Sequence, residues 1–146
     1  MASKRKKLNL RTSGKGLRQV LGDLEADIME LLWKDNPASV RDIHQSLAKN
    51  RTIAYTTVMT VMSRLADKGL LKREQHGRAY LYVPTQNRED FCSDAIGTVM
   101  QGLLGGFGEP VLSQFVDTVG AHDAAKLDEL VRLIEEKKKK AEQSAI

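Results

Sequence analysis

The stretch that decides the fold of this chain is Tyr55-Thr56-Thr57-Val58-Met59-Thr60-Val61-Met62-Ser63-Arg64-Leu65. Placed on a helix of 3.6 residues per turn, it divides into two faces. One face is apolar at the i, i+3, i+4 and i+7 spacing of a helix packed on a core, and consists of Val58, Val61, Met62 and Leu65. The other face repeats the spacing with small hydroxyls and a methionine, and consists of Thr56, Met59, Thr60 and Ser63, with Arg64 at its border.

The second face is unusual for a helix that meets only water. Threonine is β-branched and loses side-chain rotamers in a helix, so exposed helix faces favour Glu, Lys and Gln instead. In a DNA major groove, by contrast, hydroxyls reach base edges and phosphates, and threonine methyls touch the thymine methyl. The stretch therefore predicts a helix that reads DNA.

The surrounding sequence predicts the rest of a winged helix-turn-helix. Periodicity, a Ser39–Asp42 capping box and Gly69 as a helix stop predict helices at residues 23–34, 39–49 and 54–68. Two strands are expected at 70–75 and 78–83, around a turn at His76-Gly77. In this arrangement the third helix enters the major groove and the hairpin tip reaches phosphates or the minor groove. We expect Arg73, His76 and Arg78 at that tip.

Residues 85–146 predict a helical appendage. A helix capped by Asn87 is expected to end in a glycine-rich hinge at 102–108, a second to run from Pro110 to about Gly120, and a third from about Asp123 to lose its apolar stripe after Ile134. Three such helices bury little by themselves, so a two-fold dimer is expected to cover them and to match two DNA half-sites. The alternative is that they fold back on their own winged helix. The expected fold class is thus mainly α with a small β-hairpin, a winged helix-turn-helix followed by a three-helix dimerisation domain.

Charge is distributed unevenly along the 146 residues, whose net charge is +4. Residues 1–20 hold seven Lys or Arg and no acid, whereas residues 85–146 hold seven bases and eleven acids. We expect residues 1–20 to form a disordered basic arm, 21–84 the DNA-binding domain and 85–146 the dimerisation domain. The basic front indicates a polyanionic partner; the alternative for the arm is a solvated tail.

Several classes of function are not supported. No apolar run approaches a membrane span and no signal peptide is recognisable, so no membrane insertion is expected. The single cysteine, Cys92, fits a reducing cytoplasm. His44, His76 and His122 lack carboxylate or thiol neighbours at metal-ligand spacing, so no metal is expected. Without a nucleophile–base pair or an acid pair, the sequence predicts neither an enzyme nor a cofactor.

A series of motifs along the chain is characteristic of one family. They are Leu21-Gly22-Asp23-Leu24-Glu25, Val40-Arg41-Asp42-Ile43-His44, Ala54-Tyr55-Thr56-Thr57-Val58-Met59-Thr60, Arg64-Leu65 and Lys68-Gly69-Leu70-Leu71. Together they resemble the BlaI/MecI family of penicillinase and methicillin-resistance repressors, in its actinobacterial form, from about Leu21 to Ile134. The resemblance implies a homodimer that binds palindromic operators in double-stranded DNA and blocks transcription of β-lactamase or related resistance genes.

The resemblance also implies which residues touch DNA. By motif match they are Thr56, Thr57, Met59, Thr60 and Arg64 on the helix and Arg78 on the wing. Staphylococcal relatives carry cations at the positions matching Thr56 and Met59, so the operator or its direct contacts are expected to differ here. Two roles stay open: Arg64 contacts phosphate or pairs with Asp67 or another acid to hold the third helix in place, and Tyr55 contacts phosphate or covers the core.

Relatives of this family are inactivated by proteolysis, triggered by a membrane β-lactam sensor with a zinc-protease module. The bond cleaved in them is Asn-Phe in the second C-terminal helix, and the matching pair here is Gln114-Phe115. A copper-responsive branch uses paired cysteines, which the single Cys92 does not provide. Two alternatives remain: a MarR-like or PadR-like winged-helix regulator that responds to a small ligand, and a winged helix that docks another protein.

Overall fold

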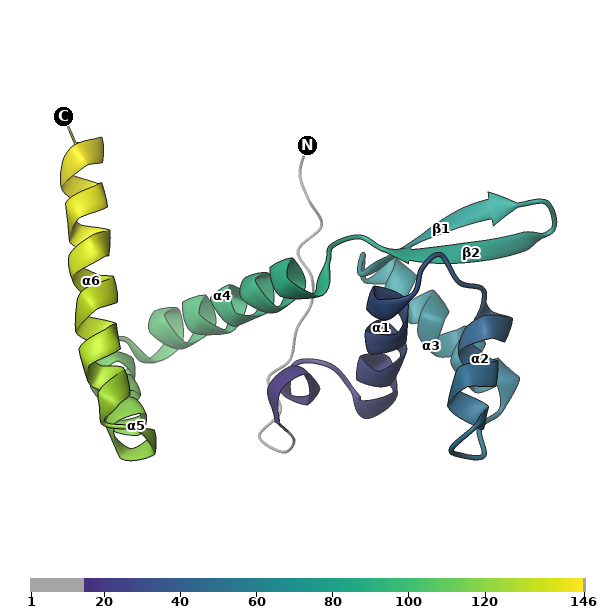
Figure 1. Cartoon of the computed structure of the whole chain (residues 1–146), viewed down its shortest axis with the longest axis horizontal. Coiled ribbons are helices and arrows are strands. Elements are labelled where there is room, and N and C mark those ends of the chain that lie inside the picture. The colour runs from purple at the N-terminus through teal and green to yellow at the C-terminus, as the bar shows by residue number, and fades with distance from the viewer. Residues whose placement is uncertain (1–14, 146) are drawn as a thin grey trace. The chain divides into compact units, whose positions relative to one another are not determined.

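The computed structural model describes residues 15–145. A short 3-10 helix η1 (Gly16–Gln19) precedes α1 (Asp23–Lys34), α2 (Val40–Ala48) and α3 (Tyr55–Asp67). Strands β1 (Leu71–His76) and β2 (Ala79–Pro84) form an antiparallel hairpin, and α4 (Arg88–Phe107), α5 (Pro110–His122) and α6 (Ala125–Ser144) follow (Figure 1). The predicted fold class, mainly helical with one hairpin in winged-helix order, is confirmed.

Local signals explain why the first three helices begin and end where they do. Glu25 accepts a hydrogen bond from the Gly22 amide at the start of α1, and Ser39 and Asp42 cap α2 reciprocally. At the end of α3, Gly69 has φ +83°, and its amide bonds to Ala66 while the Leu70 amide bonds to the Leu65 carbonyl. This is a Schellman motif, which turns the chain directly into β1.

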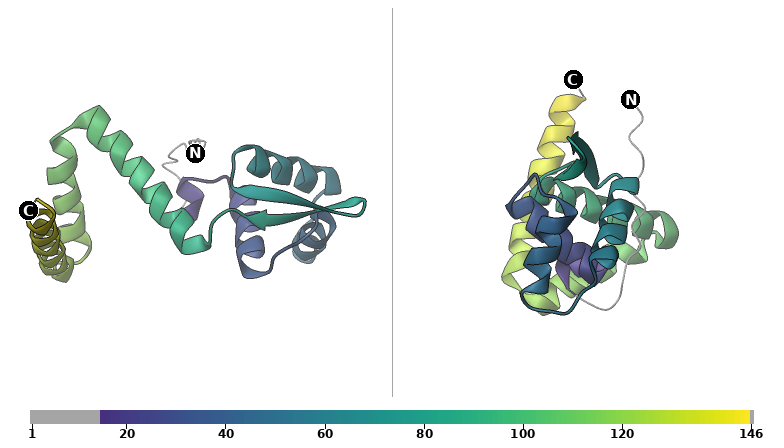
Figure 2. Two further views of the ribbon diagram at one scale, coloured as in Figure 1. Left: turned by 90° about the horizontal axis from the view of Figure 1, so that it is seen from above. Right: turned by 90° about the vertical axis from the view of Figure 1, so that its right-hand side faces the viewer.

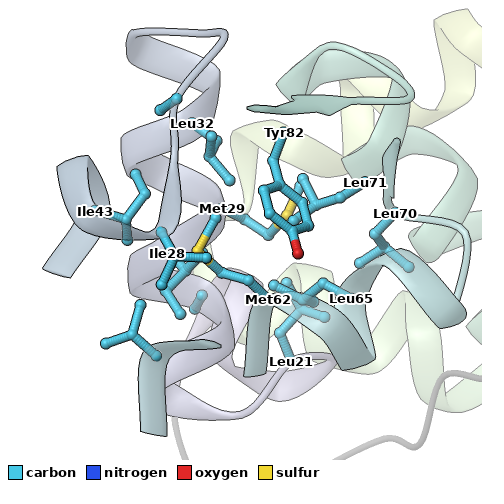
Figure 3. Close-up of a cluster of buried hydrophobic side chains, with 14 of the residues drawn as sticks. Leu21, Ile28, Met29, Leu32, Ile43, Met62, Leu65, Leu70, Leu71 and Tyr82 are labelled. Carbon is cyan, nitrogen blue, oxygen red and sulfur yellow. The ribbon is translucent and has the colours of Figure 1, made fainter. Parts of the chain in front are cut away.

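One hydrophobic core joins α1, α2, α3, the hairpin and the first turns of α4. Figure 3 shows Ile28, Met29 and Leu32 of α1 facing Met62 and Leu65 of α3. Of these side chains none is more than 1% exposed, so α3 is held by the face opposite to its hydroxyls. Tyr82 of β2 enters the same core, and its backbone pairs with Ala38 between α1 and α2.

The chain divides into two compact units, the first ending at Val99 and the second beginning at Met100. The predicted boundary, after residue 84, lies at the end of the hairpin. In the structure the first part of α4, up to Val99, also belongs to the first unit. Phe91 and Ala95 are buried there, and the Phe91 ring lies 5.4 Å from that of Trp33.

Residues 1–14 of the expected basic arm lie outside the described residues. The expectation of disorder up to residue 20 was wrong for the end of that segment. Leu17 and Val20 pack against the core, and Arg18 pairs with Asp23 at 3.2 Å and Asp27 at 2.6 Å. The acids of α1 therefore order the segment that precedes it.

The helices of the second unit differ from the sequence prediction at their ends. The glycines at 102, 105 and 106 lie inside α4, and the break comes at Gly108, with φ +72°. Pro110 begins α5 as predicted, but α5 continues past Gly120 to His122. α6 continues beyond Ile134 to Ser144, and this last part of the helix, residues 135–144, carries polar side chains and one alanine. α5 packs on α6, where the position of a Cβ on Gly120 would lie only 3.2 Å from Leu127 Cδ1.

Candidate nucleic-acid interface

α3 has the two faces that its sequence predicts. Val58, Met62 and Leu65 are completely buried. The opposite face is exposed. Met59 on this face is 44% exposed, although an apolar methionine side chain is not stabilised by contact with water. The structure brings together on this face the predicted residues Thr56, Thr57, Met59, Thr60 and Arg64.

The N-terminus of α3 lacks the caps that the two preceding helices have. Its N-cap residue, Ala54, offers no side-chain acceptor and its first turn contains no acid, whereas α2 has the Ser39 cap and both α1 and α2 have a first-turn carboxylate that accepts from the N-cap amide. The amides of Thr57 and Val58 both bond to the Ala54 carbonyl, so those of Tyr55 and Thr56 remain for an outside acceptor. An uncapped helix N-terminus favours an anion, through both its amides and the helix dipole.

Tyr55 is the first residue of α3, and its ring lies against α2, outside the core. Its ring meets the His44 ring edge-on at 5.7 Å and is 46% exposed. His44 in turn bonds through Nε2 to the Ile53 carbonyl at 2.8 Å, which holds the turn before α3. Sequence reasoning gave His44 only an ordinary polar role and missed this contact, because the contact depends on how the turn folds back on α2.

The hydroxyl of Thr60 is already in use within the helix. It donates to the Thr56 carbonyl at 2.9 Å, one turn earlier. The Thr60 oxygen can therefore still accept a hydrogen bond, while its proton is engaged. The side chain can thus offer an acceptor and a methyl group to a groove.

Arg64 does not pair with Asp67, so one of its two expected roles is absent. Asp67 pairs instead with Arg73 of β1, at 3.5 Å. The Arg64 side chain is exposed and has no hydrogen bond or ion pair with the described residues. It lines a shallow hollow on the outer face of α3, together with Met59, Thr60, Ser63 and Asp67.

The hairpin places Arg78 at its tip. His76 pairs with Ala79, so the two-residue turn is Gly77-Arg78, one residue later than predicted. Gly77 supplies the positive φ, +65°, that the first position of such a turn requires. Figures 1 and 2 show the tip projecting beyond the helices of its unit. Arg73 lies four residues before Gly77 and contacts α3, so its predicted place at the tip was wrong.

A further residue pair, which sequence reasoning did not find, holds α3 in place. Lys68 Nζ, just beyond α3, lies 2.8 Å from Glu25 Oε2 in the first turn of α1. Burial of Glu25 acts to raise its pKa, but hydrogen bonds from Lys68 and the Gly22 amide, with the charges of Lys68 and Arg64, outweigh it and leave the pKa lowered. The pair joins residues 43 positions apart, which local periodicity does not reveal.

Gln114 and Phe115, the expected cleavage pair, lie in the middle of α5. Gln114 Nε2 donates to the Thr118 hydroxyl one turn later, at 3.2 Å. Phe115 is 43% exposed and lines an apolar groove of about 470 Å³ between the end of α4 and α5, with Met100, Leu103, Phe107 and Val111. The bond between them is therefore in regular helix.

Residues 15–145 contain no group of three or more His, Cys, Asp or Glu side chains placed to hold a metal ion. Within the same residues no helix has both the length and the apolarity needed to cross a membrane. The exposed face of α3 and the hairpin tip are therefore the candidate ligand-binding surfaces of the first unit.

Comparison with known proteins decides the family. The family model described as penicillinase repressor matches residues 21–136. The chain belongs to the penicillinase repressor family. It is 38% identical over 109 residues to the transcriptional regulator BlaI of Mycobacterium tuberculosis, covering 73% of this chain and 79% of that protein. It is 23% identical over 118 residues to the penicillinase repressor of Bacillus licheniformis, covering 81% and 91%.

Solved structures of the family were also found. A solution structure of the DNA-binding domain of the repressor BlaI is 28% identical, with a TM-score of 0.44 over 48% of this chain and 85% of that one. A second holds the monomeric form of Bacillus licheniformis BlaI in complex with the blaP half-operator, at 28% identity, a TM-score of 0.42 and the same coverage.

The family assignment states what kind of protein this is. It is a DNA-binding transcriptional repressor built on a winged helix, and its family is not one of enzymes. The resemblance to the BlaI/MecI family on the motifs of residues 21–71 is thereby confirmed.

Proposed function

We propose that the chain represses transcription by inserting the exposed face of α3 into the major groove of an operator while the hairpin tip grips the flanking backbone. The observation that carries the proposal is the α3 face itself, where hydroxyls, a half-exposed methionine and an unpaired arginine are exposed beside an uncapped helix N-terminus. The hydroxyls, the methionine, the arginine and the uncapped N-terminus do not stabilise the free protein, or they lower its stability. Each can make a favourable contact with a base or a phosphate of DNA.

Roles follow from what each side chain offers. We assign base reading to Thr57, Met59 and Thr60, because their methyl and acceptor groups match base edges in the groove. Phosphate contacts go to Arg64 and Arg78, which are exposed cations with no acid paired to them in residues 15–145. Tyr55 and Thr56 join them through the open amides of the first turn, with the tyrosine hydroxyl as a further donor.

The test is a comparison of two threonines. Thr60→Ala removes a methyl and an acceptor from the reading face. Thr98→Ala is its matched control, because Thr98 on α4 makes the same bond to a carbonyl one turn earlier, at 2.9 Å, and is also exposed. We expect Thr60→Ala to weaken operator binding about 5–100-fold and to leave binding to random DNA within about twofold, as for a base contact worth about 1–3 kcal/mol.

Titrations by fluorescence anisotropy at several salt concentrations provide the measurement. Thr98→Ala should bind both DNAs like the unchanged protein. Equal losses on operator and random DNA for Thr60→Ala would show that the residue does not read bases.

We propose further that the repressor is a homodimer joined through its second unit, and that its operator is therefore palindromic. Support comes from large apolar side chains left exposed on α4, α5 and α6, among them Phe107, Leu112, Phe115, Val116, Val131 and Ile134. Large apolar side chains exposed in this way are usually covered in a stable protein, and a second copy would cover them symmetrically.

The regulated genes and the inducing signal are part of the same proposal. The names of the relatives, penicillinase repressor among them, support β-lactamase or related resistance genes as targets. Footprinting on genomic DNA would identify the operators, and a protected set without such genes would refute this part. The family assignment supports this function over a MarR-like or PadR-like response to a small ligand. We place the protein in the cytoplasm, where the operators lie.

Induction is proposed to occur by cleavage between Gln114 and Phe115, set off by a membrane β-lactam sensor-protease. Since the bond lies in regular helix, α5 must open locally before a protease can hold it in extended form. Mass spectrometry of the repressor from β-lactam-treated cells should find a fragment ending at Gln114. An intact repressor in cells whose target genes are induced would refute cleavage as the signal.

A further inference from the structure

Arg73 of β1 connects the wing to the recognition helix. Its Nη2 donates to the Ser63 hydroxyl at 3.0 Å and lies 3.5 Å from Asp67 Oδ1, so a single guanidinium reaches both of the last two turns of α3. The rest of the guanidinium lies over the ring of Tyr82, its partner in the strand register, at 6.0 Å from the ring centre. Tyr82 is only 5% exposed, so this platform is fixed in the core.

The position of Arg73 along the hairpin gives these contacts a mechanical role. Level with Arg73, the other strand is tied to the body by the Ala38–Tyr82 bridge, and nearer the base Thr85 bonds to Gly69 and Leu70. Nearer the tip, the side-chain bonds described for residues 74–81 stay within the hairpin, such as Gln75 to the Gly77 carbonyl. A two-stranded hairpin alone is marginally stable, so its direction depends on the last contacts that hold it, and Arg73 is the side chain that makes them to α3.

Arg73 also neutralises a charge that is unfavourable for DNA binding. Asp67 lines the same hollow of α3 as Thr60 and Arg64, and its side chain is 76% exposed. A carboxylate there repels phosphates and competes for Arg64. With Asp67 and Ser63 both engaged by Arg73, the free groups of the hollow are those assigned to DNA.

We propose that Arg73 is a positioning residue that fixes the direction of the wing relative to α3, so that Arg78 at the tip and the reading face of α3 meet one DNA duplex together. This rests on the proposed function, in which both surfaces touch DNA. Three residues separate Arg73 from the turn, about 10 Å of strand, so a small rotation at Arg73 moves the tip by several ångströms. Arg73 itself acts through Ser63 and Asp67 and does not touch the operator.

The experiment measures whether Arg73 and Arg78 depend on each other. Operator affinity is measured for the full-length protein, for Arg73→Gln, for Arg78→Gln and for the double variant. We expect each single change to weaken binding about fivefold to tenfold, and Arg78→Gln to cost less than about twofold once Arg73 is already Gln, because an unpositioned tip contributes little. Independent, multiplying losses would overturn the proposal.

A second measurement separates positioning from direct phosphate contact. Under the proposal, losing the latch (the contact of Arg73 with Ser63 and Asp67) also costs the phosphate contact of Arg78, so Arg73→Gln lowers the slope of log affinity against log salt concentration by about one, and adding Arg78→Gln lowers it no further. Ser63→Ala should weaken binding in the same direction as Arg73→Gln and add nothing to it in combination. A slope lowered by about two in the Arg73→Gln, Arg78→Gln double variant, with Ser63→Ala silent, would identify Arg73 as a phosphate contact and refute the latch.

Lys72→Gln is the matched control. It removes the same charge from the neighbouring position of the same strand, where the exposed side chain has no hydrogen bond or ion pair with the described residues. We expect its operator affinity to stay within about twofold of the unchanged protein. If Thr60→Ala and Arg78→Gln are silent in the unchanged background, the proposed function fails; if they weaken binding but Arg73→Gln does not couple to Arg78, the latch alone fails. Unchanged thermal unfolding of the variants excludes simple loss of the fold.

Discussion

The two units of this chain differ in how much of their apolar surface they bury. In the first, helices α1–α3, the hairpin and the start of α4 share one core, in which Ile28, Met62 and Leu65 are completely buried. In the second, no residue from Met100 to Ala145 is buried, and Phe107 is 70% and Val131 58% exposed. We therefore expect the first unit to be stable by itself, and the second to depend on the proposed association.

The ion pairs follow the same division. In the first unit most of them join parts of the chain that are distant in sequence: Arg18 and Arg51 both reach Asp27, and Lys68 reaches Glu25. In the described part of the second unit both ion pairs lie within α6, at i,i+3 and i,i+4 spacing. Such local pairs support a helix without choosing its neighbours. Tertiary specificity in the second unit is therefore expected to come from apolar packing, within the chain and in the proposed dimer.

The largest effect is expected from emptying the core of the first unit. Leu32→Ala on α1 removes a side chain with no exposed area, and we expect the free energy of unfolding of this unit to fall by about 2–5 kcal/mol. Chemical denaturation followed by Trp33 fluorescence measures it, since Trp33 is in the same unit and packs on Phe91.

Leu112→Ala is the matched change in the second unit. It removes the same atoms from a side chain that is 60% exposed, and we expect the unfolding of the first unit to change by less than about 0.5 kcal/mol. If both changes shifted Trp33-detected unfolding equally, the two units would not be energetically separate and the comparison would break down.

The next effect concerns the dimer. Val131→Asp places a charge on the exposed apolar stripe of α6, and we expect it to weaken self-association at least about tenfold, because the interface would then bury an unpaired carboxylate. Analytical ultracentrifugation measures this. Binding to a two-site operator should weaken accordingly, while binding to a single half-site should not change.

Gln143→Asp adds the same charge to the exposed, polar end of α6 and serves as the control. It should dimerise like the unchanged protein. A Val131→Asp protein that still dimerises with full strength would show that the exposed stripe of α6 is not the interface.

A smaller effect depends on pH and sharpens the role of ion pairs between elements. The pKa of Glu25 is lowered in the folded state from an ordinary value of 4.5. Its contribution to stability is therefore fully present above that value and is lost as the pH falls through the lower, folded-state pKa. We expect Glu25→Gln to cost about 1–2 kcal/mol at pH 7 and much less near pH 3, measured by denaturation at each pH.

The control for this prediction is Glu30→Gln, which removes a pair with Arg88 in which both side chains are about half exposed. It should change the free energy of unfolding by less than about 1 kcal/mol. An equal loss for Glu25→Gln at both pH values would mean that the pair with Lys68 is not what stabilises the fold.

The sequence predicted most of the first unit because its signals are local. Stripes at helical spacing, the Ser39 cap and Gly69 decide α1, α2 and α3 within a few residues of chain. The hairpin turn was one residue off, since both His76-Gly77 and Gly77-Arg78 place the glycine in a two-residue turn, and register across the strands decides between them.

The candidate site was predictable to the extent that it lies on one helix. Periodicity alone predicts that Thr60 and Arg64 are exposed. It does not predict that Arg73 contacts Ser63 and Asp67, because this contact depends on how the hairpin folds back on α3, and Arg73 was therefore assigned to the tip. The structure of residues 16–20 was missed for a related reason, because Arg18 is ordered by carboxylates of α1 and by no pattern of its own.

The glycine-rich segment before Gly108 was the clearest error in the second unit. A hinge was expected because glycine is the least favourable ordinary residue in a helix, yet α4 continues through Gly102, Gly105 and Gly106. Neighbouring residues on the apolar side of the helix, such as Leu103 and Phe107, form the wall of a groove with α5, and this packing overrides propensity.

The smallest predicted effect tests that conclusion with two glycines three residues apart. In Gly105→Ala a new Cβ meets no atom within 4 Å, so the gain in helix propensity should stabilise α4 by about 0.5–1 kcal/mol. In Gly108→Ala the alanine must adopt φ +72° at the end of α4, and we expect the free energy of unfolding to fall by about 1 kcal/mol. Thermal unfolding followed by helical circular dichroism should show opposite shifts of a few degrees. Shifts of the same sign would mean that Gly105 and Gly108 lie in one flexible hinge, and that the second unit is ordered even less by its own sequence than its exposed apolar faces imply.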